Sequence, residues 1–144
     1  MNFKPKKTKF TKHQKGRISN IPLIRSNVHF GRYSLIAKEP GRIKAVHIAA
    51  AELAIKRKLK VDRGNSSLTL RIFPHLPVTK KPAEVRMGKG KGNIDYWMTR
   101  VRIGTILFDI DCSNPTLAKI AFDVASSKLP IKTFYKDNGP KFNK

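Results

Sequence analysis

Apolar residues spaced three or four positions apart predict two helices. The first covers residues 43–60, and its apolar side chains fall on two nearly opposite faces, so we expect contacts on both sides. The second begins at Asn114, a favourable N-cap, with Pro115 in the first helical position, and it ends before Pro130. Its apolar stripe consists of Leu117, Ala118, Ala121, Phe122, Ala125 and Leu129.

Alternation of apolar and polar residues predicts strands elsewhere in the chain. Residues 68–72 form one such segment. Residues 96–103 and 106–111 form two more, which we expect to pair as a hairpin. Shorter strands are expected at residues 33–37 and 131–135.

The order of these segments has no strict βαβ rhythm. It therefore predicts an α+β fold, with two helices packed on a mixed, mostly antiparallel sheet. Pro74, Pro77 and Pro82 predict a rigid connection, and a turn is expected at Pro40 and Gly41. A length of 144 residues fits one domain. We expect a basic N-terminal arm in residues 1–20, a single domain in residues 21–136 and a polar tail in residues 137–144.

The charge of the chain points to a polyanionic partner. Lysine and arginine number 31 against 9 aspartate and glutamate, a formal net charge of +22. Such an excess repels itself in a compact state. Nucleic acid is the favoured partner because each protein cation that binds to its closely spaced phosphates releases counterions into solution, which strengthens binding. A membrane surface is the alternative, and it requires a basic amphipathic helix with bulky apolar residues opposite the charges.

The first acidic residue is Glu39, and the segment before it is dense in cations. Residues 1–20 lack apolar periodicity and interleave their charges with Phe3 and Phe10, so we expect an arm that becomes ordered on phosphates. The cations before Glu39 include Lys4, Lys6, Lys7, Lys9, Lys12, Lys15, Arg17, Arg25, Arg32 and Lys38.

Residues 86–93 form a basic glycine loop. Its sequence is Arg86-Met87-Gly88-Lys89-Gly90-Lys91-Gly92-Asn93. Alternating glycine and lysine places cations on a backbone that can adopt positive φ and approach phosphates closely, and its successive N–H groups can form an anion-binding nest. A mononucleotide P-loop is excluded because Lys89 and Lys91 are each followed by glycine and not by the serine or threonine that the motif requires. The G-x-G-x-G spacing likewise does not fit the dinucleotide pattern G-x-G-x-x-G. A solvated turn with incidental lysines is the plain alternative.

No set of residues predicts catalysis or a metal site. None of the histidines pairs with another histidine or a cysteine at ligand spacing, and we expect His13 and His29 to contact RNA. Asp109 and Asp111 permit an acid–base or magnesium interpretation. We favour a solvated strand edge or ion pairs with arginines for them. Cys112 is the single cysteine, so no intramolecular disulfide is expected.

Segments along the chain resemble the bacterial type of large-subunit ribosomal protein sixteen, in the order of that family. The resemblance runs from about residue 2 to residue 135, and the basic glycine loop followed by Tyr96 and Trp97 is its most specific part. The matching segments are Lys4-Pro5-Lys6-Lys7-Thr8-Lys9-Phe10, Lys15-Gly16-Arg17, Phe30-Gly31-Arg32-Tyr33, Arg71-Ile72-Phe73-Pro74, Lys81-Pro82-Ala83-Glu84-Val85 with the loop, and Lys128-Leu129-Pro130-Ile131-Lys132-Thr133.

The resemblance implies a structural role in the ribosome and no enzymatic activity. Members of the family bind large-subunit ribosomal RNA between the peptidyl-transferase centre and the central protuberance, and they help shape the aminoacyl-tRNA site. Their counterpart of the basic glycine loop points toward the catalytic RNA and bound tRNA. The family fold is an α+β sandwich with two helices on a mixed sheet.

This chain departs from the family pattern at three places. Lys44 replaces the serine or threonine that caps the first helix, and Glu52 stands where arginine is common. Residues 63–67 differ from the Gly-Lys sequence that usually leads into the next strand. The resemblance begins almost at Met1, which indicates that no presequence precedes the family core. Residue choice rich in Ile, Lys, Asn and Phe favours a mitochondrial ribosome in the matrix, with plastid or bacterial cytoplasm as alternatives.

The expected partners are large-subunit ribosomal RNA, aminoacyl-site tRNA and neighbouring ribosomal proteins, without a cofactor, a metal, a membrane or a homo-oligomer. The competing hypotheses are a phosphate-handling enzyme that uses the glycine loop with Asp109 and Asp111, and a membrane-active basic protein. The expected RNA-binding residues are Lys4, Lys6, Lys7, Lys9, Lys12, His13, Lys15, Arg17, Arg32, Arg86, Met87, Gly88, Lys89, Gly90, Lys91 and Gly92.

Overall fold

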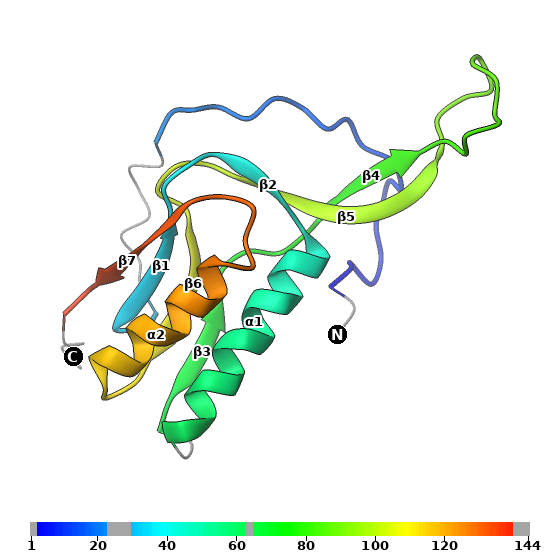
Figure 1. The fold of residues 1–144 in the computed structure, drawn as a ribbon. Coiled ribbons are helices and arrows are strands. Elements are labelled where there is room, and N and C mark those ends of the chain that lie inside the picture. Colours follow the sequence, from blue (N-terminus) through cyan, green and yellow to red (C-terminus); the bar gives the residue numbers. More distant parts are fainter. Residues whose placement is uncertain (1–2, 23–29, 63–64, 140–144) are drawn as a thin grey trace.

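The computed structural model describes residues 3–22, 30–62 and 65–139. In these ranges it contains two α-helices, seven strands and one short 3-10 helix, which confirms the α+β class (Figure 1). The elements are β1 (Tyr33–Ala37), β2 (Gly41–Lys44), α1 (Ala45–Leu59), the 3-10 helix (Lys60–Asp62), β3 (Ser67–Leu70), β4 (Leu76–Lys80), β5 (Asn93–Val101), β6 (Ile106–Asp111), α2 (Pro115–Ser126) and β7 (Thr133–Asp137).

The strands divide between two sheets in which every described pairing is antiparallel. One sheet has the order β3-β6-β1-β7 and the other has the order β2-β5-β4. The expectation that β5 and β6 pair as a hairpin is wrong. The chain does turn at residues 102–105, but Gly104 N donates to Ala37 O and Ala37 N donates to Thr105 O, both at 2.9 Å. The turn is therefore attached to the end of β1, and β6 continues alongside β1 instead of β5.

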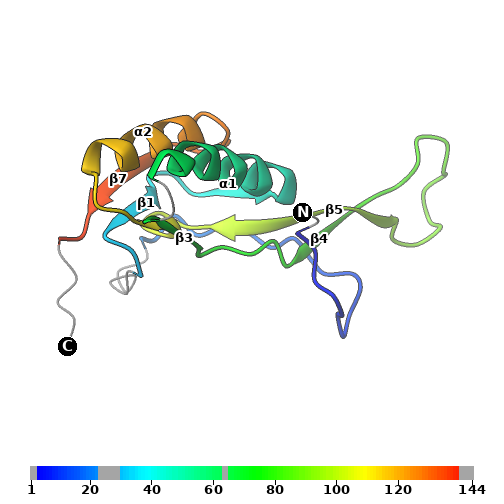
Figure 2. The same cartoon turned by 90° about the horizontal axis from the view of Figure 1, so that it is seen from below.

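The two helices lie side by side over one face of the four-stranded sheet, and the N-terminal arm runs on the opposite side (Figure 2). The core between helices and sheet is apolar, and its largest fully buried members include Tyr33, Leu35, Phe108 and Phe122. Burial of a side chain of this size contributes roughly 1.5–3 kcal/mol. The second sheet extends from this core.

Helix α1 begins two residues later than the pattern predicts, because residues 41–44 pair with β5 as strand β2. Ile43 therefore lies in the sheet, opposite Thr99. Lys44 precedes the helix and makes no side-chain capping hydrogen bond, as expected from its chemistry. The buried face carries Ile48 and Ile55, whereas Val46 and Leu53 on the other apolar face are exposed.

Helix α2 agrees closely with the sequence pattern. Asn114 Oδ1 accepts a hydrogen bond from Thr116 N at 3.0 Å, and Pro115 occupies the first turn. Ala118, Ala121, Phe122 and Ala125 are buried, as the apolar stripe predicts. The following strand β7 lies two residues beyond its predicted position.

The sequence pattern does not predict strand β4, because its prolines indicate a rigid connection. It pairs with β5 through residues that include Pro77 opposite Trp97. A proline is tolerated there because β4 is at the edge of its sheet, where an N–H is not needed for pairing. Leu76, Val78 and Met98 form a small separate apolar cluster on this hairpin. The β4–β5 hairpin reaches away from the helices and carries residues 81–92 at its tip (Figure 1).

Candidate nucleic-acid interface

The basic glycine loop projects from the body of the protein at the end of the β4–β5 hairpin (Figures 1 and 2). Its cationic side chains are exposed, and Met87 is 96% exposed. Gly88 and Gly90 have φ of +85° and +78°, a conformation that favours glycine. No atom lies within 4 Å of the position that a Cβ would take at either residue. The loop therefore presents bare backbone and charge to an open surface.

Gly92 has a different role from the other two glycines. It is half-buried, and a Cβ there would collide with the carbonyl oxygen of Lys80 at the end of β4. The missing side chain lets the two ends of the loop approach each other. Gly92 therefore sets the geometry at the base of the loop.

The N-terminal arm and the loop contact each other directly. Lys12 Nζ donates to Lys91 O at 2.8 Å, and Lys91 Nζ donates to His13 O at 2.7 Å. His13 also lies against Phe10, with ring centroids 6.5 Å apart in an edge-on arrangement. These reciprocal contacts join two of the sequence-predicted segments, which are far apart in the chain, into one cationic surface.

The arm also lies against the three-stranded sheet at Gly16. Arg42 of β2 donates from Nη2 to Gly16 O at 2.8 Å. Gly16 has φ of +63°, and a Cβ there would lie 2.5 Å from Nη1 of Arg100 on β5. Arg42 and Arg100 are exposed and directly opposite each other in the β2–β5 pairing. Like charges placed in this way repel, which favours an anion nearby.

Sequence reasoning did not single out Arg42, Arg100 and Arg102. The only sequence signal was the alternation of Arg100 and Arg102, which places both on one side of an extended chain. Their significance depends on the pairing of β2 with β5 and on the path of the arm. Neither feature can be deduced from local pattern.

The remaining predicted cations are distributed unevenly. Lys4, Lys6, Lys7, Lys9, Lys15 and Arg17 are exposed along the arm. Arg32 lies elsewhere, because β1, which it immediately precedes, is at the other end of the molecule from the loop (Figure 1). It is half-buried, with its guanidinium carbon 5.4 Å from the Tyr33 ring centroid. Arg25 and His29, and residues 140–144 of the tail, lie outside the described residues.

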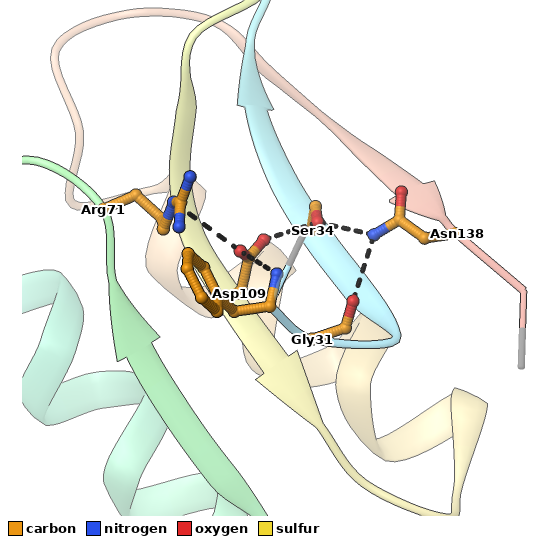
Figure 3. Close-up of polar contacts among 6 residues, drawn as sticks. Gly31, Ser34, Arg71, Asp109 and Asn138 are labelled. Carbon is orange, nitrogen blue, oxygen red and sulfur yellow. Dashed lines mark hydrogen bonds and ion pairs between the residues drawn. The ribbon is translucent and has the colours of Figure 1, made fainter. Parts of the chain in front are cut away.

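Asp109 is part of a polar network that connects β6 and β1 with the residues that directly follow β3 and β7 (Figure 3). It lies on β6, is 1% exposed, and accepts hydrogen bonds from Ser34 Oγ of β1 at 2.5 Å and from Phe30 N at 3.0 Å. Arg71, which follows β3, places Nε 3.8 Å from its Oδ2. Asn138, which follows β7, donates to Ser34 Oγ at 2.7 Å.

This geometry decides between the interpretations of the carboxylates. The expected ion pair with an arginine is confirmed, but the expected solvated edge is wrong, because β6 is an interior strand and Asp109 is buried. Its oxygens are used by donors within the protein. Among the described residues, no group of three or more His, Cys, Asp or Glu side chains could hold a metal ion.

The single cysteine is not set up as a nucleophile. Cys112 Sγ donates to Asn114 O at 3.3 Å, and burial raises the pKa of the Cys112 thiol, which disfavours a nucleophilic thiolate.

No helix in the described part of the chain has the length and apolar character needed to cross a membrane. The surface as a whole defines a small cationic α+β protein suited to contact with a polyanion.

Comparison with known proteins gives the family. Residues 5–135 match the family of ribosomal protein L16p/L10e, and the chain belongs to this family. Large ribosomal subunit protein uL16 of Sphingopyxis alaskensis is 51% identical over 131 residues, which cover 91% of this chain and 90% of that protein. The protein of the same name from Buchnera aphidicola is 47% identical over 133 residues, covering 92% and 95%. The corresponding figures for Paracoccus denitrificans are 48% identity over 131 residues and coverage of 91% and 93%. The chain is thus a bacterial-type member with a structural ribosomal role, and it is not an enzyme.

Proposed function

We propose that the protein is a constituent of the large ribosomal subunit that binds large-subunit ribosomal RNA near the peptidyl-transferase centre and helps shape the aminoacyl-tRNA site. The relatives are named as large-subunit proteins, and their names support the assignment of this chain to the large subunit. The observation that carries the RNA contact is the joining of the arm to the exposed loop by Lys12 and Lys91. It concentrates exposed cations on one projecting surface.

The loop is suited to bind phosphates in two ways. Arg86, Lys89 and Lys91 supply charge, and the backbone at Gly88 and Gly90 can approach a ligand without steric hindrance. Contacts of this kind position a protein on RNA without reading its sequence. In this proposal the loop is the part that points to the catalytic RNA and to aminoacyl-site tRNA.

The arm anchors the protein on ribosomal RNA. Most of the arm runs on the side of the four-stranded sheet opposite the helices (Figure 2), so most of the outer surface of the helices is left available for neighbouring ribosomal proteins. Each phosphate that the arm neutralises strengthens binding at low salt through counterion release. We include residues 1–20 as an RNA-binding arm and residues 21–136 as the folded domain.

We also propose the mitochondrial ribosome as the location, on the basis of the residue choice rich in Ile, Lys, Asn and Phe. Fractionation of cells that express the tagged chain tests this point. Recovery with mitochondrial ribosomes supports it. Recovery with plastid or cytoplasmic ribosomes alone contradicts the location and leaves the ribosomal role intact.

Site-directed crosslinking tests the proposed position of the loop. A photoreactive amino acid replaces Lys89 in one variant and Lys119, exposed on α2, in a matched control. After assembly into large subunits, the variant at position 89 should crosslink to RNA of the peptidyl-transferase centre and, with tRNA bound, to its acceptor arm. Equal crosslinking from position 119 to those sites, or none from position 89, contradicts the proposal.

A further inference from the structure

A hollow of about 250 Å³ lies between the N-terminal arm and the three-stranded sheet. Since a water molecule takes about 30 Å³, the space holds a phosphate group with several waters. Three separate segments form its walls. The lining residues are Arg17, Ile18 and Ser19 of the arm, His75 before β4, and Arg100 and Arg102 at the end of β5.

The described lining of the hollow carries positive charge, and none of the residues in that lining has a carboxylate. Arg17, Arg100 and Arg102 make no ion pair with any residue in the described ranges. Three guanidinium groups around one small space repel one another, and a bound anion removes that repulsion. Guanidinium groups also match phosphate oxygens with paired donors, which makes arginine the preferred residue for this ligand.

The wall formed by the arm is held by specific contacts. Gly16 adopts a positive φ, accepts a hydrogen bond from Arg42 and lies against the Arg100 guanidinium, so it fixes the arm where Arg17 begins. On the opposite wall, His75 Nδ1 donates to Phe73 O at 3.1 Å, because a carbonyl oxygen can only accept. The imidazole is thereby oriented by the backbone that leads into β4.

We propose that this hollow binds one phosphodiester group of the RNA backbone, held jointly by Arg17, Arg100 and Arg102. The inference rests on the proposed function and adds to it a defined site outside the glycine loop. The lining offers charge and hydrogen-bond donors but no Phe, Tyr or Trp ring on which a base could stack, so the phosphate and not the base is recognised.

The salt dependence of RNA binding distinguishes one shared phosphate from three separate contacts. The full-length chain is titrated with purified bacterial large-subunit RNA over a range of salt concentrations, as wild type and as the triple variant Arg17→Gln, Arg100→Gln, Arg102→Gln. If the three side chains share one phosphate, the slope of log affinity against log salt falls by about one for the triple variant. A fall of about three indicates three separate phosphates and overturns the inference, as does no change.

A second variant disrupts the hollow without removing any charge. In Gly16→Ala the new Cβ is placed against Arg100 and the backbone is strained, so we expect the slope to fall by the same amount of about one. Gly139→Ala is the matched control, because Gly139 also has positive φ, +78°, but has no atom near its Cβ position. Its slope should equal that of wild type.

The outcomes separate the inference from the proposed function. If wild type binds with a strong salt dependence and both Gly16→Ala and the triple variant keep its slope, the hollow does not bind phosphate although the protein still binds RNA. If wild type itself shows no salt-dependent binding, the proposed RNA contact is wrong. Circular dichroism of each variant shows whether it is folded before its slope is compared.

Discussion

Replacement of Asp109 by alanine removes the buried carboxylate on which the larger sheet depends. The carboxylate accepts hydrogen bonds from Ser34 and from the backbone of Phe30, and it lies 3.8 Å from Arg71 Nε. These partners belong to β1, to the segment before β1 and to the segment after β3. Asp109→Ala therefore breaks an ion pair and two hydrogen bonds that connect neighbouring strands.

The size of the effect follows from the burial of the pair. Loss of one partner of a buried ion pair destabilises by about 3–5 kcal/mol. The Arg71 side chain is 24% exposed, so it keeps part of its hydration and the lower end applies, about 3 kcal/mol in total. Since a domain has a free energy of unfolding of about 5–15 kcal/mol, this is a large share. With a urea m-value of about 2 kcal/mol/M, the midpoint should fall by roughly 1.5 M.

Urea unfolding followed by Trp97 fluorescence measures this shift, because the chain has a single tryptophan, half-buried on β5. The matched control is Asp123→Ala, an exposed aspartate on α2, which should change the free energy of unfolding by no more than about 0.5 kcal/mol. If Asp109→Ala has no larger effect than the control, the network in Figure 3 does not stabilise the sheet and the reasoning is refuted.

Three further predictions concern local features of the fold. Asn114→Ala removes the acceptor of Thr116 N at the start of α2 and should lower the free energy of unfolding by about 1 kcal/mol in urea titrations, whereas Asn114→Asp should restore most of it. Burial raises the pKa of Tyr33 above 10.0, so the folded state keeps this proton longer than the unfolded state. The contribution of Tyr33 to stability should be constant below its unfolded pKa of about 10 and be lost as the pH rises through its higher folded pKa, so alkaline pH should destabilise Tyr33→Phe less than wild type; an identical pH profile of unfolding for both proteins would contradict this. Finally, Gly92→Ala should lower the melting temperature measured by circular dichroism more than Gly90→Ala does, because a Cβ at position 92 meets the Lys80 carbonyl oxygen, whereas position 90 has open space and only the backbone strain of its positive φ. Equal melting temperatures would show that the base of the loop is not tightly constrained.

The sequence predicted those elements whose signals are local. Helix α2 has a capping asparagine, a proline in its first turn and a single apolar stripe, and the structure confirms all three. Strand β1 was also predicted with its observed bounds. The predicted start of α1 is two residues too early because Ile43 suits either a helix or a strand. Only the pairing of Ile43 opposite Thr99 selects the strand.

Features that depend on contacts between distant segments could not be predicted. The alternation in residues 96–111 indicated two strands but not that each would join a different sheet, because pairing partners are chosen by the tertiary fold. The same holds for the interface. The cations of the glycine loop and the arm are visible in the sequence, whereas the contact between Lys12 and Lys91 requires the folded chain.

Sedimentation tests the central claim most directly. The tagged full-length chain is expressed in cells, and lysates are separated on sucrose gradients at physiological salt, with large-subunit RNA located in the same fractions. A constituent of the large subunit should sediment with large subunits and with complete ribosomes. Recovery of the chain only at the top of the gradient, apart from large-subunit RNA, would contradict the account.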